Sequence, residues 1–418
     1  MKMSEMSERQ LLLVKVATVA VVGVAVFLAM THGPGARPRP ESIPIAQQGR
    51  GWLKEIDGYL VLHVEGTPEE MGEQHGRLLK ERIQKACRAL ITDEYVARAR
   101  TRLIEATKVM ERHLPDEFRR EMKALAKAAE IDYWDCVAMQ LFGDTERAQL
   151  PAPTRTREPA AAVGGMQCTS YAVFGAATKT GELIVGRNFD YLDHGVGKYG
   201  AILMHAKPDK GYAFVTITWA GIINGWTLMN EKGLVTCNNT EYRGENSMEG
   251  ISTCFMLRKA AQFAGTVKEG IEIVRKGPRA CGTLMLIAGG EPADAAVVEY
   301  DCRDMAVRTA PTGYVMAANT YRALHRATAT PAQDADDSRY GVLLQLIREN
   351  YGKIDRTMNF AGAEGVPLGS INLHSALLFP KDLIIRVSMG KTPAYKERYR
   401  GFRMTRDGVT AEGDAARQ

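Results

Sequence analysis

The spacing of hydrophobic positions along the chain changes character near residue 168. Between about residues 68 and 142, apolar side chains recur every three to four positions among Arg, Lys, Glu and Ala, which predicts amphipathic helices. Thr67 precedes Pro68 and is followed by Glu70, so we expect a capped helix start there. Pro115 and Asp132 mark further helix starts, and residues 59–65 read as a short strand before the first helix.

From residue 168 onward, short β-rich runs predominate. Residues 168–174 and 182–187, joined by a turn over 175–181, predict a hairpin. Further strands are expected at 200–205, 213–219, 284–288, 295–300 and 383–389, and helices at 252–263, 267–276 and 338–350. Strands, then helices, then strands again predict two packed sheets with helices outside them.

Two Pro- and Gly-rich breaks divide the chain into three parts. Residues 1–45 are expected to be a signal or membrane anchor with its linker, because the apolar run Val16–Met30 follows Lys2, Arg9 and Lys15. We favour an uncleaved anchor that places the rest of the chain on the exported side; a cleaved signal peptide is the alternative. Residues 46–167 form a mainly helical segment that ends in a flexible linker, and residues 168–418 form the catalytic domain.

Charge and cysteine content narrow the function classes. The net charge of +5 is spread without a basic tract, so nucleic acid is not an expected partner. The seven cysteines include no C-x-x-C pair, which argues against a structural zinc site or a thioredoxin-type motif. In an exported chain their odd number leaves at least one thiol unpaired within the monomer.

Cys168 is the candidate for that thiol. It stands at the start of a strand directly after the second break, where a packing residue would be unusual, although a free cysteine commonly fills space. If the chain were cut before Cys168, its α-amine could take the thiol proton and no histidine would be needed. His75, His194, His205 and His374 stand in contexts equally suited to surface or structural roles, so a Cys-His arrangement has no local signature.

The end of the second hairpin strand supplies charged partners for this cysteine. A hairpin returns Arg187 and Asp190 to the neighbourhood of Cys168. A cation beside a thiol favours the thiolate, and a carboxylate can hold an α-amine. Without the cysteine opposite, the two residues would be interpreted as a surface ion pair of little energetic value.

These motifs resemble a known family. Cys-Thr-Ser-Tyr at 168–171 followed by Gly-Arg-Asn-Phe-Asp-Tyr at 186–191 is similar to the autoproteolytic acyl-coenzyme A:isopenicillin N acyltransferase family and its relatives, the choloylglycine hydrolases and penicillin V acylases. Weaker matches are the segments 66–76, 218–239 and 317–319, so that the resemblance covers roughly residues 59–400.

The resemblance implies a fold and a set of roles. The fold is a four-layer αββα N-terminal-nucleophile sandwich preceded by a mainly helical segment. Cys168 would be the nucleophile, Asp190 the contact to its α-amine and Arg187 the guanidinium beside the thiol. Asn319 and Asn239, or the neighbouring Asn238, would stabilise the oxyanion, although an Asn pair is also typical of a turn. The family often has Gly before the nucleophile, where this chain has Gln167, so cleavage between Gln167 and Cys168 is a hypothesis.

The predicted reaction is attack of the Cys168 thiol on a small-molecule amide or related acyl carbonyl, giving a thioester that water or an amine acceptor resolves. No cofactor and no metal is implied. One alternative is a conventional thiol hydrolase that never cleaves itself. The other is an envelope-anchored binding protein with a degenerate site. The sequence leaves the acyl and amine groups of the substrate and the oligomeric state open.

Overall fold

The computed structural model describes residues 42–91, 94–149, 167–192, 200–242, 244–324 and 338–413. Residues Glu41–Gln418 form one compact unit, distinct from Met1–Pro40. The predicted N-terminal anchor run and the linker before residue 167 lie outside the described residues. In the part of the chain that is described, no helix is long and apolar enough to cross a bilayer.

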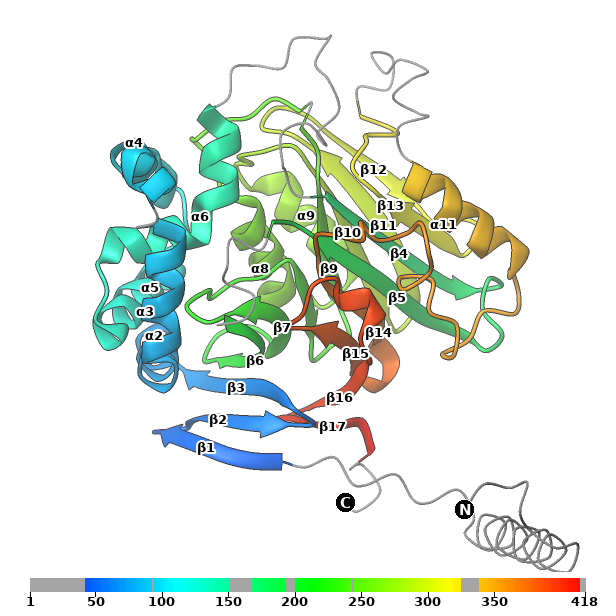
Figure 1. Cartoon of the computed structure of the whole chain (residues 1–418). Helices are drawn as coiled ribbons and strands as arrows, with labels where there is room; N and C mark the ends of the chain where they lie inside the picture. Colours follow the sequence, from blue (N-terminus) through cyan, green and yellow to red (C-terminus); the bar gives the residue numbers. More distant parts are fainter. Residues whose placement is uncertain are drawn as a thin grey trace, which may run out of the picture. The chain divides into compact units, whose positions relative to one another are not determined.

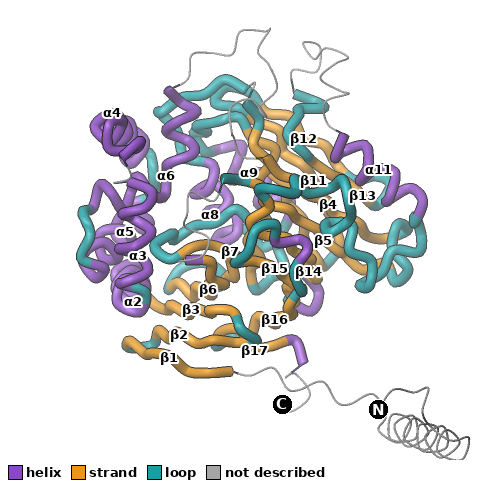
Figure 2. The backbone as a smooth tube through the Cα atoms, viewed as in Figure 1, coloured by secondary structure: helices purple, strands orange, loops and turns teal. Residues whose placement is uncertain are grey.

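Two sheets form the centre of this unit (Figures 1 and 2). The larger has ten strands in the order β1-β2-β3-β6-β7-β8-β9-β10-β11-β12, and only β3 and β6 pair in parallel. Its strands are β1 Ser42–Gln48, β2 Gly51–Ile56, β3 Tyr59–Gly66, β6 Ala201–Pro208, β7 Phe214–Trp219, β8 Thr227–Asn230, β9 Val235–Thr240, β10 Thr283–Gly290, β11 Ala293–Tyr300 and β12 Met305–Thr309.

The second sheet has seven antiparallel strands in the order β13-β4-β5-β14-β15-β16-β17. They are β4 Gln167–Gly175, β5 Gly181–Asp190, β13 Tyr314–Ala317, β14 Asn372–Phe379, β15 Ile384–Met389, β16 Arg400–Thr405 and β17 Gly408–Ala411. The predicted hairpin is therefore β4–β5. Its turn begins and ends with Gly175 and Gly181, whose φ angles of +56° and +78° favour glycine.

Helices cover the outer faces of both sheets. They are α2 Pro68–Leu78, α3 Lys80–Ile91, α4 Glu94–Glu111, α5 Asp116–Ala129, α6 Tyr133–Gln149, α8 Thr253–Phe263, α9 Val267–Lys276 and α11 Ser338–Glu349, with short 3-10 turns at Pro380–Asp382 and Ala394–Lys396. Helices α8 and α9 pack on the large sheet, and α11 packs on the small one. Helices α2–α6 lie together at the left of Figure 1 and α11 at the right.

A hydrophobic core lies between the two sheets and contains side chains from both. Val61 and Val215 from the large sheet pack against Val185 and Val387 from the small one. Alternate residues of β4 and β5 face α11 instead, as Ile184 does. Two sheets that share one core and carry helices outside confirm the four-layer αββα prediction.

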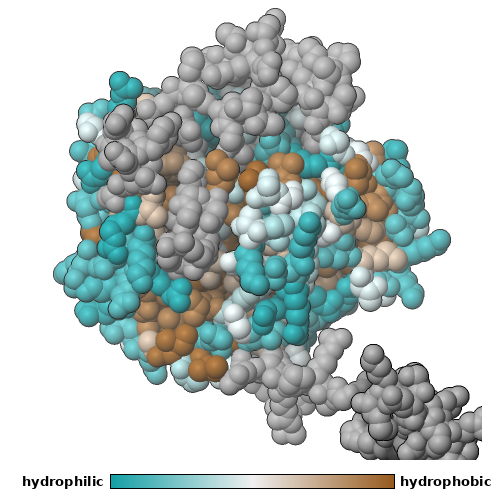
Figure 3. Space-filling model, viewed as in Figure 1, coloured by the Kyte–Doolittle hydropathy of each residue, from teal (hydrophilic) through white to brown (hydrophobic). Residues whose placement is uncertain are grey.

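The segment before Cys168 contributes strands as well as helices. Its strand β3 pairs in parallel with β6, Val61 opposite Leu203, so both sides of residue 168 build one sheet. The capping box of Thr67 and Glu70 is present as predicted. Strand β1 forms the open edge of this sheet and exposes Ile43 and Ile45, and hydrophobic atoms gather over this region at the lower left of Figure 3.

Candidate active site

The β4–β5 register brings the predicted thiol and guanidinium together. Cys168 lies opposite Phe189, and Ser170 lies opposite Arg187. The side chains of Cys168 and Arg187 are fully buried, and Nη2 of Arg187 donates to Sγ of Cys168 at 3.2 Å. The hairpin geometry expected from the sequence is therefore present.

The thiol of Cys168 is influenced by two opposing effects. Burial raises its pKa, because a thiolate loses solvation inside the protein, and the Arg187 guanidinium opposes this effect. Burial is the larger of the two, so the pKa lies above its ordinary value. Arg187 alone would lower the pKa of the thiol, as a neighbouring cation does, but in the uncut chain burial outweighs this effect.

The backbone of Cys168 is held by Asn319 and by an arginine that the sequence did not point to. The Cys168 amide donates to Oδ1 of Asn319 at 2.8 Å. Arg339 donates from Nη2 to the same oxygen at 2.8 Å and from Nη1 to the Cys168 carbonyl at 3.0 Å. Arg339 belongs to α11, 171 positions along the chain from Cys168. A single arginine on a predicted amphipathic helix gives no signal of such a role, because most such residues are solvated.

Asp190 lies on the face of β5 that is turned toward α11. Its carboxylate accepts from the Leu368 amide at 3.0 Å and from Nδ2 of Asn372 at 2.7 Å, and one oxygen lies 3.9 Å from Nη1 of Arg339. Burial raises the pKa of Asp190 to about 6, and these neighbours only partly offset the effect. In the uncut chain the hydrogen bond from the Cys168 amide goes to Asn319 and not to Asp190.

Each of the two predicted oxyanion residues donates one of its amide N–H groups to a backbone carbonyl. Asn239 donates from Nδ2 to the Ala317 carbonyl at 3.1 Å and accepts from the Ser170 hydroxyl at 2.7 Å, so it ties the two sheets together. Asn319 donates from Nδ2 to the Thr240 carbonyl at 2.6 Å. A primary amide has two N–H groups.

One histidine reaches the arginine through a hydroxyl. Nε2 of His374 lies 2.9 Å from Oγ1 of Thr227, which accepts from Nε of Arg187 at 3.4 Å. Sequence reasoning gave His374 no site role. His75 accepts from the Gly221 amide and His205 contacts His63, so both lie elsewhere, while His194 is outside the described residues.

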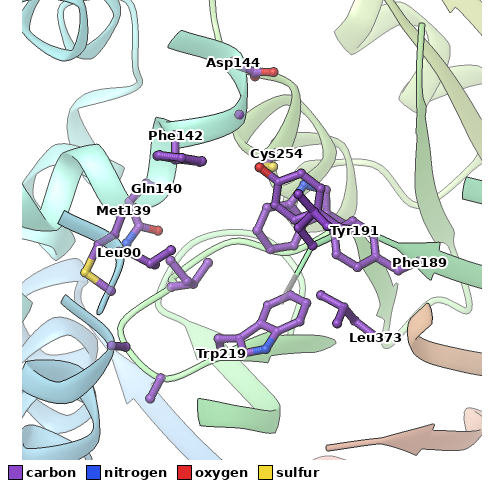
Figure 4. Close-up of a pocket in the computed structure, with 16 residues that line it drawn as sticks. Leu90, Met139, Gln140, Phe142, Asp144, Phe189, Tyr191, Trp219, Cys254 and Leu373 are labelled. Carbon is purple, nitrogen blue, oxygen red and sulfur yellow. The ribbon is translucent and has the colours of Figure 1, made fainter. Parts of the chain in front are cut away.

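An apolar pocket adjoins Phe189, the strand partner of Cys168 (Figure 4). It encloses about 750 Å³ of empty space, counting the part open to solvent. Aromatic side chains form one wall, and helices α3 and α6 form the other. The lining residues most relevant below are Leu90, Met139, Phe142, Trp219, Trp226 and Leu373. Cys168 packs in the same hydrophobic cluster as Phe189, Trp219 and Leu373.

The cysteines of the chain are reduced and mostly buried. All seven cysteines are free thiols, and six of them are buried. In the described part of the chain, no group of three or more His, Cys, Asp or Glu residues could hold a metal ion.

A model of a known family matches the middle of the chain. The model of the acyl-coenzyme A:6-aminopenicillanic acid acyl-transferase family matches residues 176–362, which include Arg187, Asp190, Asn239 and Asn319 but begin after Cys168. The resemblance inferred from the motifs is confirmed.

Similar sequences come from distant organisms. The chain is 24% identical to an uncharacterized protein of Archaeoglobus fulgidus over 73% of this chain and 58% of that protein. It is 22% identical to protein dcd1B of Dictyostelium discoideum over 57% of this chain and 50% of that protein. The chain thus spans little more than half the length of these two relatives.

Three solved structures are similar to parts of the chain. The Caenorhabditis elegans ortholog of N-acylethanolamine-hydrolyzing acid amidase is 15% identical, covers 51% of this chain and 93% of its own, and has a TM-score of 0.40. A variant of the conjugated bile acid hydrolase of Clostridium perfringens is 14% identical, covers 58% of this chain and 96% of its own, and has a TM-score of 0.42. Penicillin V acylase of Agrobacterium tumefaciens is 14% identical, covers 57% of this chain and 87% of its own, and has a TM-score of 0.35.

Proposed function

We propose that the protein is a cysteine N-terminal-nucleophile enzyme that hydrolyses, or transfers the acyl group of, a small-molecule amide through a thioester on Cys168. The observation that carries the proposal is the contact between Nη2 of Arg187 and Sγ of Cys168, together with the two hydrogen bonds that hold the Cys168 backbone. A buried cation directed at a thiol stabilises negative charge on sulfur.

The enzyme would first cut itself between Gln167 and Cys168. The Cys168 sulfur adds to the Gln167 carbonyl carbon, the C–N bond breaks, and water hydrolyses the resulting thioester. Gln167 then ends in a carboxylate, and Cys168 carries a free α-amine. Arg339 supports this step because it contacts both the Gln167 side chain, at 3.2 Å, and the Cys168 carbonyl.

The mature site would use that amine as the general base. The amine takes the thiol proton, the thiolate attacks the substrate carbonyl, and the proton passes to the departing amine. Arg187 stabilises the thiolate, and the second Nδ2 hydrogen of Asn319 is the donor proposed for the oxyanion. Asp190 and Asn319 are proposed to hold the amine, and in the uncut chain Asn319 accepts from the Cys168 amide at 2.8 Å. Water, or an acceptor amine, releases the acyl group.

The acyl group is proposed to be apolar, because it would enter the pocket next to Phe189. Its walls are aromatic and aliphatic, and its two most polar lining residues are already engaged: Gln140 donates to the Gly221 carbonyl, and Asp144 pairs with Arg147. A lipid-like or aromatic N-acyl amide fits this lining. We also propose that the apolar run Val16–Met30 tethers the protein to a membrane with this unit on the exported side, which membrane fractionation and protease protection would test.

Covalent trapping tests the reaction. Mature protein is mixed briefly with a fluorogenic N-octanoyl amide of 7-amino-4-methylcoumarin, quenched in acid and digested, and the mass of the Cys168 peptide is measured. We expect an octanoyl adduct on that peptide and release of the coumarin. Turnover with the adduct on another residue, or equal turnover by Cys168→Ala, would refute the assignment. Full turnover by an uncut chain would favour the conventional thiol hydrolase.

A further inference from the structure

The guanidinium of Arg187 has an unusual set of partners. It is fully buried, yet within the described residues no carboxylate lies within ion-pair distance of it. Its hydrogen bonds go to the Cys168 sulfur and to the Thr227 hydroxyl, and Nη1 has no partner. Asp190 acts on it only from beyond ion-pair distance. A buried cation without a contacting counter-ion is costly, and its position must be imposed by the groups around it.

The Thr227 hydroxyl is the second group that holds this guanidinium, at Nε, next to the Nη2 that contacts the sulfur. Thr227 lies on β8 of the large sheet, whereas Arg187 and His374 lie on β5 and β14 of the small one, so this contact crosses the core between the sheets. Arg187 can only donate, so Oγ1 of Thr227 accepts from its Nε. His374 holds the same oxygen from the other side at 2.9 Å.

The position of His374 is itself rigid. Its ring stacks on Phe189, with centroids 5.3 Å apart and planes 14° apart, and it is fully buried. Burial and the charge of Arg187 keep the pKa of His374 well below its ordinary value, so the ring is neutral. A carboxylate in this place would neutralise Arg187, whereas a neutral ring orients Thr227 and leaves the positive charge to the sulfur.

We propose that Thr227 and His374 are positioning residues, which hold the Arg187 guanidinium against the sulfur of Cys168 and so make the thiol reactive. Neither residue touches the reacting atoms; each acts through Arg187. The inference rests on the proposed function, because it assigns a purpose to Arg187 only if Cys168 is the nucleophile.

The test uses the pH dependence of alkylation of Cys168 by iodoacetamide in the full chain, measured by peptide mass so that the other six thiols do not contribute. Thr227→Val keeps the shape of the side chain and removes the hydroxyl, Thr227→Ser keeps the hydroxyl, and His374→Phe keeps a ring without a hydrogen-bonding nitrogen. Thr218→Val is the matched control, since the buried Thr218 hydroxyl has no partner.

We expect Thr227→Val and His374→Phe to slow alkylation of Cys168 at pH 7 about tenfold and to raise its pH midpoint by about one unit. Thr227→Ser and Thr218→Val should match the wild type. If Thr227 served only to fill space, Thr227→Ser would change the alkylation of Cys168 more than Thr227→Val does. If Thr227→Val keeps the wild-type midpoint while still folded by circular dichroism, the positioning role is wrong.

A second measurement can be made even on variants that fold poorly. It also distinguishes failure of this inference from failure of the proposed function. The rate of self-cleavage during renaturation is compared for Thr227→Val and Thr227→Ser, and we expect Ser to cleave at least tenfold faster. Equal rates would overturn the positioning role and leave the proposed function intact. A wild-type Cys168 that neither cleaves the chain nor forms an acyl adduct would instead overturn both.

Discussion

The Arg187 guanidinium lies 3.2 Å from the Cys168 sulfur, and both side chains are fully buried between the two sheets. The two residues come from neighbouring strands but are not register partners, since Arg187 lies opposite Ser170. The planar guanidinium spans this offset, so that its Nη2 contacts the sulfur while its Nε contacts Thr227.

Replacement of Arg187 by lysine tests whether charge alone is sufficient. The ammonium keeps the charge but cannot contact the sulfur and Thr227 together, because it lacks the planar fork. We expect Arg187→Lys to lower kcat/KM for the coumarin amide about 100-fold, and Arg187→Met, which removes the charge, to lower it further. Arg308→Lys, on β12, where the guanidinium pairs with Glu299, is the control. Wild-type kinetics in Arg187→Lys would mean that the guanidinium has no specific role.

Arg339 offers a test of a residue found only from the structure. Its loss removes the donors to the Cys168 carbonyl and to Asn319 and leaves Asp190 without its nearest cation. We expect Arg339→Ala to slow self-cleavage at least tenfold. Arg348→Ala, exposed on the same helix, should cleave at the wild-type rate. Equal rates in both variants, measured by gel densitometry, would remove Arg339 from the site.

Asp190 predicts a pH dependence of self-cleavage. Its pKa is raised to about 6, so the carboxylate becomes protonated as the pH falls through that value and its attraction for Arg339 weakens. We expect the cleavage rate of the wild type to fall between pH 7 and pH 5. Asp190→Asn should cleave slowly at both pH values, whereas the exposed Asp294→Asn should follow the wild type.

The melting temperature of Asp190→Asn separates a functional role of Asp190 from a structural one. Because the folded-state pKa of Asp190 lies above its ordinary value, ionised Asp190 opposes folding at neutral pH. Asp190→Asn should therefore unfold at the same or a higher temperature than the wild type at pH 7.5. A large fall in melting temperature would show that lost activity reflects lost structure.

Buried histidines predict acid sensitivity of the fold. Burial lowers the pKa of His75 and of His205 to about 3, and lowers that of His63. The unfolded chain therefore takes up protons first as the pH falls from about 6.5, and the stability that these histidines confer at neutral pH is lost between that value and about 3.

The effect can be assigned to single positions by thermal melts at pH 7.5, 6 and 5. At pH 5, His75 and His205 should each lower the free energy of unfolding by about 2 kcal/mol. His75→Gln keeps an acceptor for the Gly221 amide and should flatten the dependence, while the partly exposed His113→Gln should not. Identical slopes in all three proteins would exclude His75 as a source.

The sequence was sufficient to predict the β4–β5 hairpin and the proximity of Cys168 and Arg187, because both depend on local signals. Turn glycines and alternating residues determine the β4–β5 register, and that register places Arg187 beside Cys168. Nine strands of the described part of the chain were not predicted: β1, β2, β8, β9, β12, β13, β14, β16 and β17. Strand β14 is buried on both faces, so it lacks alternation, and β9 is rich in Asn and Thr.

The unpredicted parts of the site depend on contacts between distant segments. Thr227, Arg339 and His374 reach the site from β8, α11 and β14, and no local pattern marks any of them. A buried arginine on a helix has the same sequence signature as a solvated one. The preference of the Cys168 amide for Asn319 over Asp190 likewise depends on the packing of three strands.

Intact mass and N-terminal sequencing of the wild type, Cys168→Ala and Cys302→Ala test the central claim most directly. Cys302 is a partly exposed thiol outside the site and serves as the matched control. The account predicts a fragment of residues 168–418, about 28 of the chain's 46.0 kDa by proportion, which begins with cysteine in the wild type and in Cys302→Ala. Cys168→Ala should stay uncut at that bond. An uncut wild type, or the same fragment from Cys168→Ala, would contradict the assignment of Cys168 as an N-terminal nucleophile.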